Sequence, residues 1–145
     1  MKSKGFSLAE IVVVLAIIGV IAAVGVPLMA NWWQSQALRA GAEELVSILN
    51  RGRQLAITRN GNVCVTQNAS RVRLELNACG GAPWTGPGTD GQGWFRIQNG
   101  GQIVGNPGVV FTNLGAAAPG GQYVVQVNNR QTTVTVAVSG RITIP

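Results

Sequence analysis

The stretch KGFSLAEIVVVLAIIGVIAAVGVPLMA, residues 4–30, decides the architecture of this chain. Its residues 11–30 form a run of 20 residues without a polar side chain. A helix of that length spans about 30 Å, which is the thickness of the hydrocarbon core of a bilayer. Gly19, Gly25 and Pro27 would weaken a helix in water, but they are tolerated in lipid, where the backbone has no other partner. We therefore expect a membrane-spanning helix.

Positive charge is distributed unevenly around this run. Lys2 and Lys4 precede it, and no positive charge follows until Arg39. Because basic residues are retained on the cytoplasmic side, the amino terminus is expected in the cytoplasm. The chain is then a single-pass protein of the inner membrane, with the rest of its sequence outside.

Glu10 stands at the entrance to the apolar run, where a carboxylate is costly unless it has a partner. Two interpretations of this segment give Glu10 no specific role. The segment would be a plain membrane anchor, or a secretory signal peptide cleaved after Ala30. The signal peptide fits less well, because the apolar region is too long and Leu28 occupies a position that needs a small residue.

The string KGFSLAE, residues 4–10, followed by an apolar run, resembles the class III signal of type IV pilins and type II secretion pseudopilins. The resemblance implies cleavage after Gly5 and N-methylation of Phe6 by a prepilin peptidase/methyltransferase. It makes residues 1–5 a cytoplasmic leader peptide that is removed. Glu10 then becomes the acid five residues into the mature chain.

This processing suggests a role for Glu10 in assembly. Cleavage creates a new positive amine on Phe6, next to lipid. In a bundle of helices, Glu10 of one subunit can pair with that amine of a neighbour, so each charge is buried only when it is matched. Our hypothesis is that the pair favours assembly and sets the axial register.

Residues 31–60 continue the helical pattern as an amphipathic half, and Asn60-Gly61 is a stop signal. A helix from about Phe6 to Arg59 would be about 80 Å long, so residues 6–30 project into membrane or other subunits. The apolar side chains of this half form one stripe along the helix, and we expect the sheet that follows to cover it. Its residues are Leu38, Gly41, Ala42, Leu45, Ile48, Leu49, Gly52, Leu55 and Ala56.

Residues 61–145 are expected to form a periplasmic β-sheet domain, because the apolar period changes to two after Gly61. The predicted fold class is α+β: a long helix packed on one antiparallel sheet of five to seven short strands. The strands are expected around 63–65, 72–76, 94–97, 109–111, 123–127, 133–138 and 141–144. Residues 78–93 and 115–121 are expected to be surface loops.

Cys64 and Cys79 lie in or beside adjacent predicted strands, on the oxidising side of the membrane. We expect a disulfide between them. The alternative is two buried free thiols.

The composition argues against an enzyme. The chain of 145 residues has a net charge of +6, no histidine, and no lysine beyond Lys4. Such a chain has no Ser-His or Cys-His pair and no Schiff-base lysine, and two cysteines with five scattered acids make no zinc cluster. We expect no cofactor and no metal. The spacing of Glu43, Glu44, Glu75 and Asp90 does not favour an acid/base pair.

The segment LVSILNRGRQLAITRN, residues 45–60, narrows the resemblance to type II secretion pseudopilin H and FimT-type minor pilins. Gly52 replaces an alanine of that family segment, and VCV (residues 63–65), Cys79, Gly93-Trp94 and Ser139-Gly140-Arg141 also fit it. The resemblance implies a low-abundance subunit near a filament tip that helps initiate assembly with other pilin or pseudopilin subunits.

The same family leaves an alternative, because FimT-type minor pilins in some species bind DNA for uptake. Their G-R-x-R pattern reads Gly140-Arg141-Ile142-Thr143 here, without the second arginine. The candidate DNA contacts are Arg71, Arg73, Arg96, Arg130 and Arg141. Arginine suits phosphate, although Arg71 and Arg73 equally suit a solvated sheet surface. A third interpretation is an anchored exported protein with an unrelated β domain.

Overall fold

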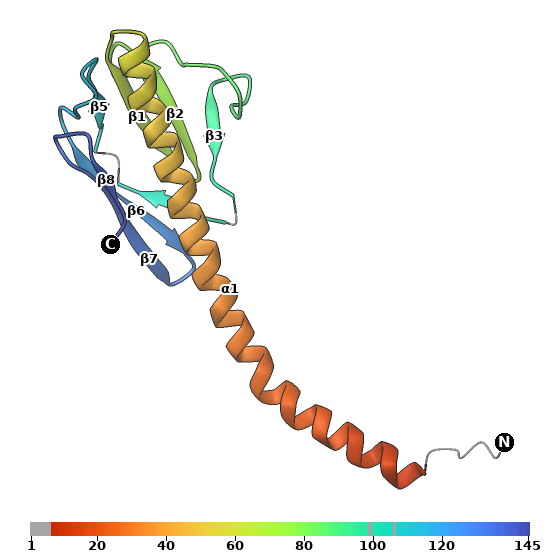
Figure 1. The fold of residues 1–145 in the computed structure, drawn as a ribbon. Coiled ribbons are helices and arrows are strands. Elements are labelled where there is room, and N and C mark those ends of the chain that lie inside the picture. The colour runs from red at the N-terminus through yellow and green to blue at the C-terminus, as the bar shows by residue number, and fades with distance from the viewer. Residues whose placement is uncertain (1–6, 99, 106) are drawn as a thin grey trace. The chain divides into compact units, whose positions relative to one another are not determined.

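The computed structural model describes residues 7–98, 100–105 and 107–145 (Figure 1). The chain divides into two compact units, one that ends at Trp33 and one that comprises Gln34–Pro145. The predicted leader, with Gly5 and the methylation site Phe6, lies outside the described residues. Helix α1 (Leu8–Thr58) contributes to both units.

The first unit consists of the apolar part of α1. The Ser7 carbonyl accepts hydrogen bonds from the amides of Glu10 (3.0 Å) and Ile11 (3.2 Å), which begins the helix directly after Ser7. Its large apolar side chains are exposed, and its most apolar window has a mean hydropathy of 3.0. The helix therefore has the length and composition to cross a membrane, as the sequence predicts.

The second unit packs the remainder of α1 with two antiparallel sheets. The first sheet has the order β3-β2-β1-β5, and the second has the order β4-β6-β7-β8. The strands of the first sheet are β1 (Val63–Asn68), β2 (Arg71–Leu76), β3 (Trp94–Arg96) and β5 (Val110–Phe111). Those of the second are β4 (Gln102–Val104), β6 (Gly121–Val127), β7 (Arg130–Val136) and β8 (Ile142–Thr143).

This architecture confirms the α+β fold class and corrects the predicted sheet. Instead of one sheet with five to seven strands, the strands form two sheets of four. Strand β4 is absent from the prediction because only Ile103 of its three residues is buried, which is too little for an alternating pattern. The predicted strand around 133–138 begins earlier, at Arg130, and ends at Val136.

The core forms where the predicted stripe of α1 meets both sheets. Seven of the nine residues of the stripe are buried. The other two, Leu38 and Leu55, are partly buried and pack against the core. Gly52 permits close approach, because a Cβ at this position would lie 3.0 Å from Cδ2 of Leu74. The buried Tyr123 of β6 donates its hydroxyl to the Val65 carbonyl of β1 at 3.3 Å, which ties the two sheets together.

Candidate functional site

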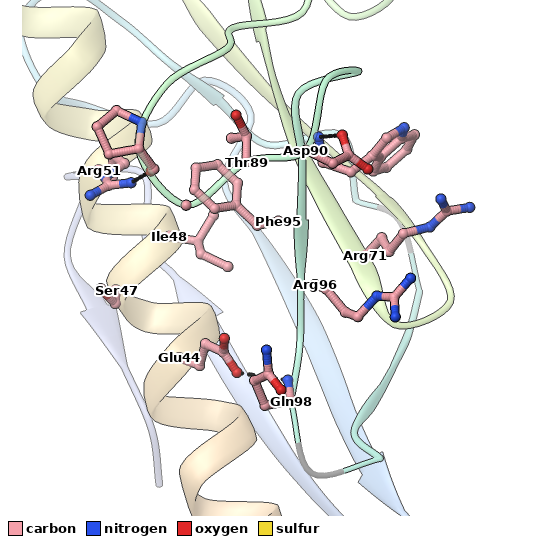
Figure 2. Close-up of a pocket in the computed structure, with 13 residues that line it drawn as sticks. Glu44, Ser47, Ile48, Arg51, Arg71, Thr89, Asp90, Phe95, Arg96 and Gln98 are labelled. Atoms are coloured by element: carbon pink, nitrogen blue, oxygen red, sulfur yellow. Dashed lines mark hydrogen bonds between the residues drawn. The ribbon is translucent and has the colours of Figure 1, made fainter.

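A groove of about 820 Å³ lies beside β3 in the second unit, and Figure 2 shows its lining. Three parts of the fold build it: one face of α1, the loop before β3, and the residues of β2 and β3. The lining residues are Glu44, Ser47, Ile48, Arg51, Arg71, Pro87, Gly88, Thr89, Asp90, Trp94, Phe95, Arg96 and Gln98. We call this the β3 groove.

Strand register brings three of the predicted arginines together at one side of this groove. Arg71 of β2 lies directly opposite Arg96 of β3, and Arg73 lies opposite Trp94. Because directly opposed residues share a face of a sheet, these four side chains stand on one face. The guanidinium groups of Arg73 and Arg71 both lie over the Trp94 ring, with their Cζ atoms 4.6 Å and 5.3 Å from its centroid.

Arg73 is engaged within the fold. Its Nε donates to Oε1 of Glu75 at 2.9 Å, and its Nη2 makes a second, closer contact with the same oxygen. Glu75 is 1% exposed, and its other oxygen accepts the Gly80 amide at 2.6 Å. Burial of the carboxyl raises the pKa of Glu75, but the Gly80 amide and Arg73 outweigh it, so the pKa lies below its ordinary value. Of the three clustered arginines, Arg71 and Arg96 remain available for a ligand.

Asp90 supplies negative charge near these two arginines. Its Oδ1 accepts the amides of Gln92 and Trp94, both at 2.9 Å, which holds the turn before β3. The Trp94 amide chiefly lowers the pKa of Asp90, and the positive charges of Arg71 and Arg96 add to the effect. This carboxylate is therefore ionised at neutral pH, yet one of its oxygens is already occupied by backbone.

The side of the groove formed by α1 is fixed by two contacts. Oε2 of Glu44 accepts the Gln98 amide at 2.9 Å, and Arg51 donates to the Pro87 carbonyl. The Arg51 guanidinium also lies over the ring of Phe95, with its Cζ 5.6 Å from the centroid. The helix thus holds both the strand and the loop that border the groove.

The other two predicted arginines lie elsewhere. Arg130, at the start of β7, donates to Oγ of Ser35 at 2.9 Å, and Arg141 is exposed just before β8. Arg130 belongs to the second sheet and Arg141 directly precedes a strand of it, so the five candidate DNA contacts are divided between two sheets. The neighbouring Gly140 has a φ of 80°, and a Cβ there would lie 1.9 Å from the Gly115 carbonyl oxygen, so this turn requires glycine.

Cys64 and Cys79 form a disulfide. Cys64 lies opposite Glu75 in the β1–β2 pair, and Gly80, which Glu75 binds, follows Cys79 directly. The disulfide agrees with the prediction from the sequence, whereas the role of the carboxylate beside it was not predicted. The alternation of Arg71, Arg73 and Glu75 along one strand face was the available signal.

The described acids do not gather into a metal-binding cluster. Glu10 lies exposed in the first turn of α1. Glu43 pairs with Arg39 at 3.1 Å, and the other three acids accept the separate hydrogen bonds given above. Within the described ranges, no three His, Cys, Asp or Glu side chains gather to hold a metal ion.

Comparison with known proteins places these features in context. Residues 1–26 match the prokaryotic N-terminal methylation motif. The type IV minor pilin FimU of Pseudomonas aeruginosa has the same fold, with a TM-score of 0.56 and 14% identity over 79% of this chain and 92% of FimU. The chain thus has a pilin-like fold.

Two further structures share this pilin-like fold. A second crystal form of FimU gives a TM-score of 0.53 at 14% identity, over 74% of this chain and 92% of that one. The minor pseudopilin EpsH from the type 2 secretion system of Vibrio cholerae gives 0.51 at 13% identity, over 74% of this chain and 95% of EpsH. No curated protein matches this chain.

Proposed function

We propose that this protein is a minor pilin or pseudopilin, a non-enzymatic subunit that helps initiate assembly of a type IV pilus or a type II secretion pseudopilus. One observation carries the proposal: a methylation motif over residues 1–26 extends into the exposed apolar first part of a 51-residue helix, and a pilin-like β domain follows that helix. A polymerising helix needs such an uncovered apolar surface, because neighbouring subunits or lipid must bury it.

The proposed pathway begins at the inner membrane. Prepilin peptidase removes residues 1–5 after Gly5, and Phe6 is methylated. Residues 6–30 hold the subunit in the bilayer, residues 31–60 anchor the domain, and residues 61–145 remain periplasmic. On assembly, Glu10 pairs with the new amine of a neighbouring subunit.

The distribution of arginines favours the structural role over DNA binding as the primary function. A surface that follows a duplex needs several cations along one face. Here Arg73 is bound to the buried Glu75, Arg130 lies on the other sheet, and Arg141 directly precedes a strand of that sheet. The filament role therefore remains the function that we propose.

Mass spectrometry of the protein from its native cells tests the proposal. We expect a chain that begins at methylated Phe6 and co-purifies with filaments. A Gly5→Val variant should keep its leader and stay out of filaments. Full-length, unmethylated protein that never co-purifies with a fibre would contradict the proposal.

Deletion of the gene then separates the two systems. Loss of pilus-dependent movement with normal protein secretion assigns the subunit to a pilus, and the reverse phenotype assigns it to a secretion pseudopilus. Deletion that affects neither process argues against the proposal.

A further inference from the structure

Among the residues that the structure describes, none pairs with the outer edge of strand β3 at Arg96. The Ile97 amide donates to the Ser70 carbonyl at 2.7 Å, so Arg71 and Arg96 form a non-hydrogen-bonded pair. The N–H and C=O of Arg96 consequently point away from β2. On both sides of Arg96 the edge is occupied, because Asp90 binds the N–H and C=O of Trp94 and Glu44 binds the Gln98 amide.

Two positively charged side chains lie beside this edge of β3. Arg71 and Arg96 are directly opposed across the strands, an arrangement that is unfavourable for like charges. Figure 2 shows both side chains directed to the same side of β3, with Asp90 above them. Among the described residues no salt bridge involves either guanidinium, and Asp90 already uses Oδ1 for backbone amides.

We propose that the β3 groove binds a short extended segment of another protein, whose backbone pairs with Arg96 and whose paired residue is Asp or Glu. Backbone pairing supplies affinity, as in other additions of a peptide to a sheet edge. Because paired residues share a face, the acidic side chain stands beside Arg96 and within reach of Arg71. Its neighbours in the segment point to the opposite face. The volume of about 820 Å³ is that of a typical ligand site.

A second copy of this chain does not supply the segment. Three of its five acids, Glu10, Glu43 and Glu44, lie in α1. Glu75 is buried, and Asp90 holds its own turn. The partner is therefore a different protein with an acidic residue in an extended segment. This inference does not depend on the filament role.

Fluorescence anisotropy with a labelled peptide tests the proposal on the full chain in detergent micelles. The probe is Ac-GTVEVTG-amide, and its glutamate is the residue expected to pair with Arg96. Arg96→Gln and Arg71→Gln should each weaken binding by about tenfold, the effect of one lost charge-assisted hydrogen bond. Arg130→Gln, which changes an arginine of the other sheet, should leave binding unchanged. Circular dichroism establishes that each variant is folded.

Three further probes separate the contributions. A GTVQVTG peptide should bind about tenfold more weakly, and so should a peptide that is N-methylated at its glutamate, which removes the donor to the Arg96 carbonyl. Hydrogen exchange of the segment that contains Arg96 should slow when the acidic peptide binds. A duplex DNA of about ten base pairs, one turn of helix, serves as the competing anion.

Two results would overturn the inference. Equal binding of the N-methylated and unmodified peptides would show that strand pairing is absent. Binding of the duplex but not of the acidic peptide, abolished by the same arginine substitutions, would make the cluster a nucleic-acid site. None of these measurements involves a filament, so failure of the proposed subunit role leaves their outcome unaffected.

Discussion

Gly80 donates its backbone N–H to the carboxylate of Glu75 at 2.6 Å, one residue after the disulfide cysteine Cys79. The other oxygen of Glu75 accepts from Arg73. This buried carboxylate thus has a partner on each oxygen, which offsets the cost of removing it from water. The loop after β2 is consequently fastened to the first sheet twice, covalently by Cys79 and electrostatically by Glu75.

Replacement of this carboxylate should destabilise the second unit. Glu75→Gln keeps the shape but loses the charge that Arg73 faces, and we expect unfolding free energy to fall by about 1–3 kcal/mol. Glu43→Gln is the matched control, since Glu43 and Arg39 are both exposed and such pairs contribute about 0–1 kcal/mol. Urea unfolding in micelles measures both. Similar losses for the two variants would show that Glu75 has no special role.

The lowered pKa of Glu75 predicts a loss of stability in acid. The folded state favours the ionised carboxylate, so this contribution is complete above the ordinary glutamate pKa of about 4.3. It disappears as the pH falls through the lower pKa of the folded state. The unfolding midpoint of the wild type should therefore decline with acidification below that pH.

The corresponding variants identify the group that titrates. Glu75→Gln should show a shallower decline than the wild type. Asp90→Asn tests the exposed turn carboxylate, whose pKa is lowered in the same direction. If Glu75→Gln leaves the pH profile unchanged while Asp90→Asn flattens it, the acid sensitivity originates in the turn and not beside the disulfide.

Reduction of the disulfide should also destabilise the domain. The sequence separation of Cys64 and Cys79 is 15 residues, for which the chain-entropy model gives about 3 kcal/mol. Thermal unfolding with and without reductant measures the loss, and intact mass establishes that both thiols have formed. An unchanged melting temperature in fully reduced protein would contradict the prediction.

The sequence predicted those parts of the fold that repeat a simple period. The apolar stripe of α1 keeps one period over many residues, and β2 alternates buried and half-buried residues over its first four positions, so the positions of both follow from the sequence. Partition into two sheets depends on contacts far apart in sequence, such as that between Tyr123 and Val65. No local pattern contains that information.

The candidate site shows the same division. The clustering of Arg71 and Arg73 follows from alternation along one strand, but the opposition of Arg71 and Arg96 depends on the register of β2 and β3. The intervening loop of Gly and Pro residues does not specify that register. Arg130 and Arg141 lie apart from the other three arginines because one is in the second sheet and the other directly precedes its strand β8. The prediction of a single sheet did not contain this division.

Gly52 should resist replacement by a large side chain. Its position on α1 faces Leu74, Phe111 and Val65, all within 4 Å of where a Cβ would lie. We expect Gly52→Leu to cost about 1–3 kcal/mol through overpacking of the core. Gly19→Leu is the control, because a Cβ there would meet nothing within 4 Å. Equal effects on urea unfolding of the second unit would show that close approach at Gly52 does not limit packing.

Glu10 provides the decisive test of assembly through α1. In the filament that we propose, the carboxylate of the apolar first turn is buried with its partner, and removing one partner of a buried pair costs about 3–5 kcal/mol. Glu10→Gln should therefore reduce incorporation into filaments by at least about 100-fold. Membrane insertion and cleavage after Gly5 should continue. Glu43→Gln, which removes an exposed carboxylate from the same helix, should assemble normally. Immunoblots of sheared filament and membrane fractions measure the ratio, and full incorporation of Glu10→Gln would exclude pairing with a neighbour's amine.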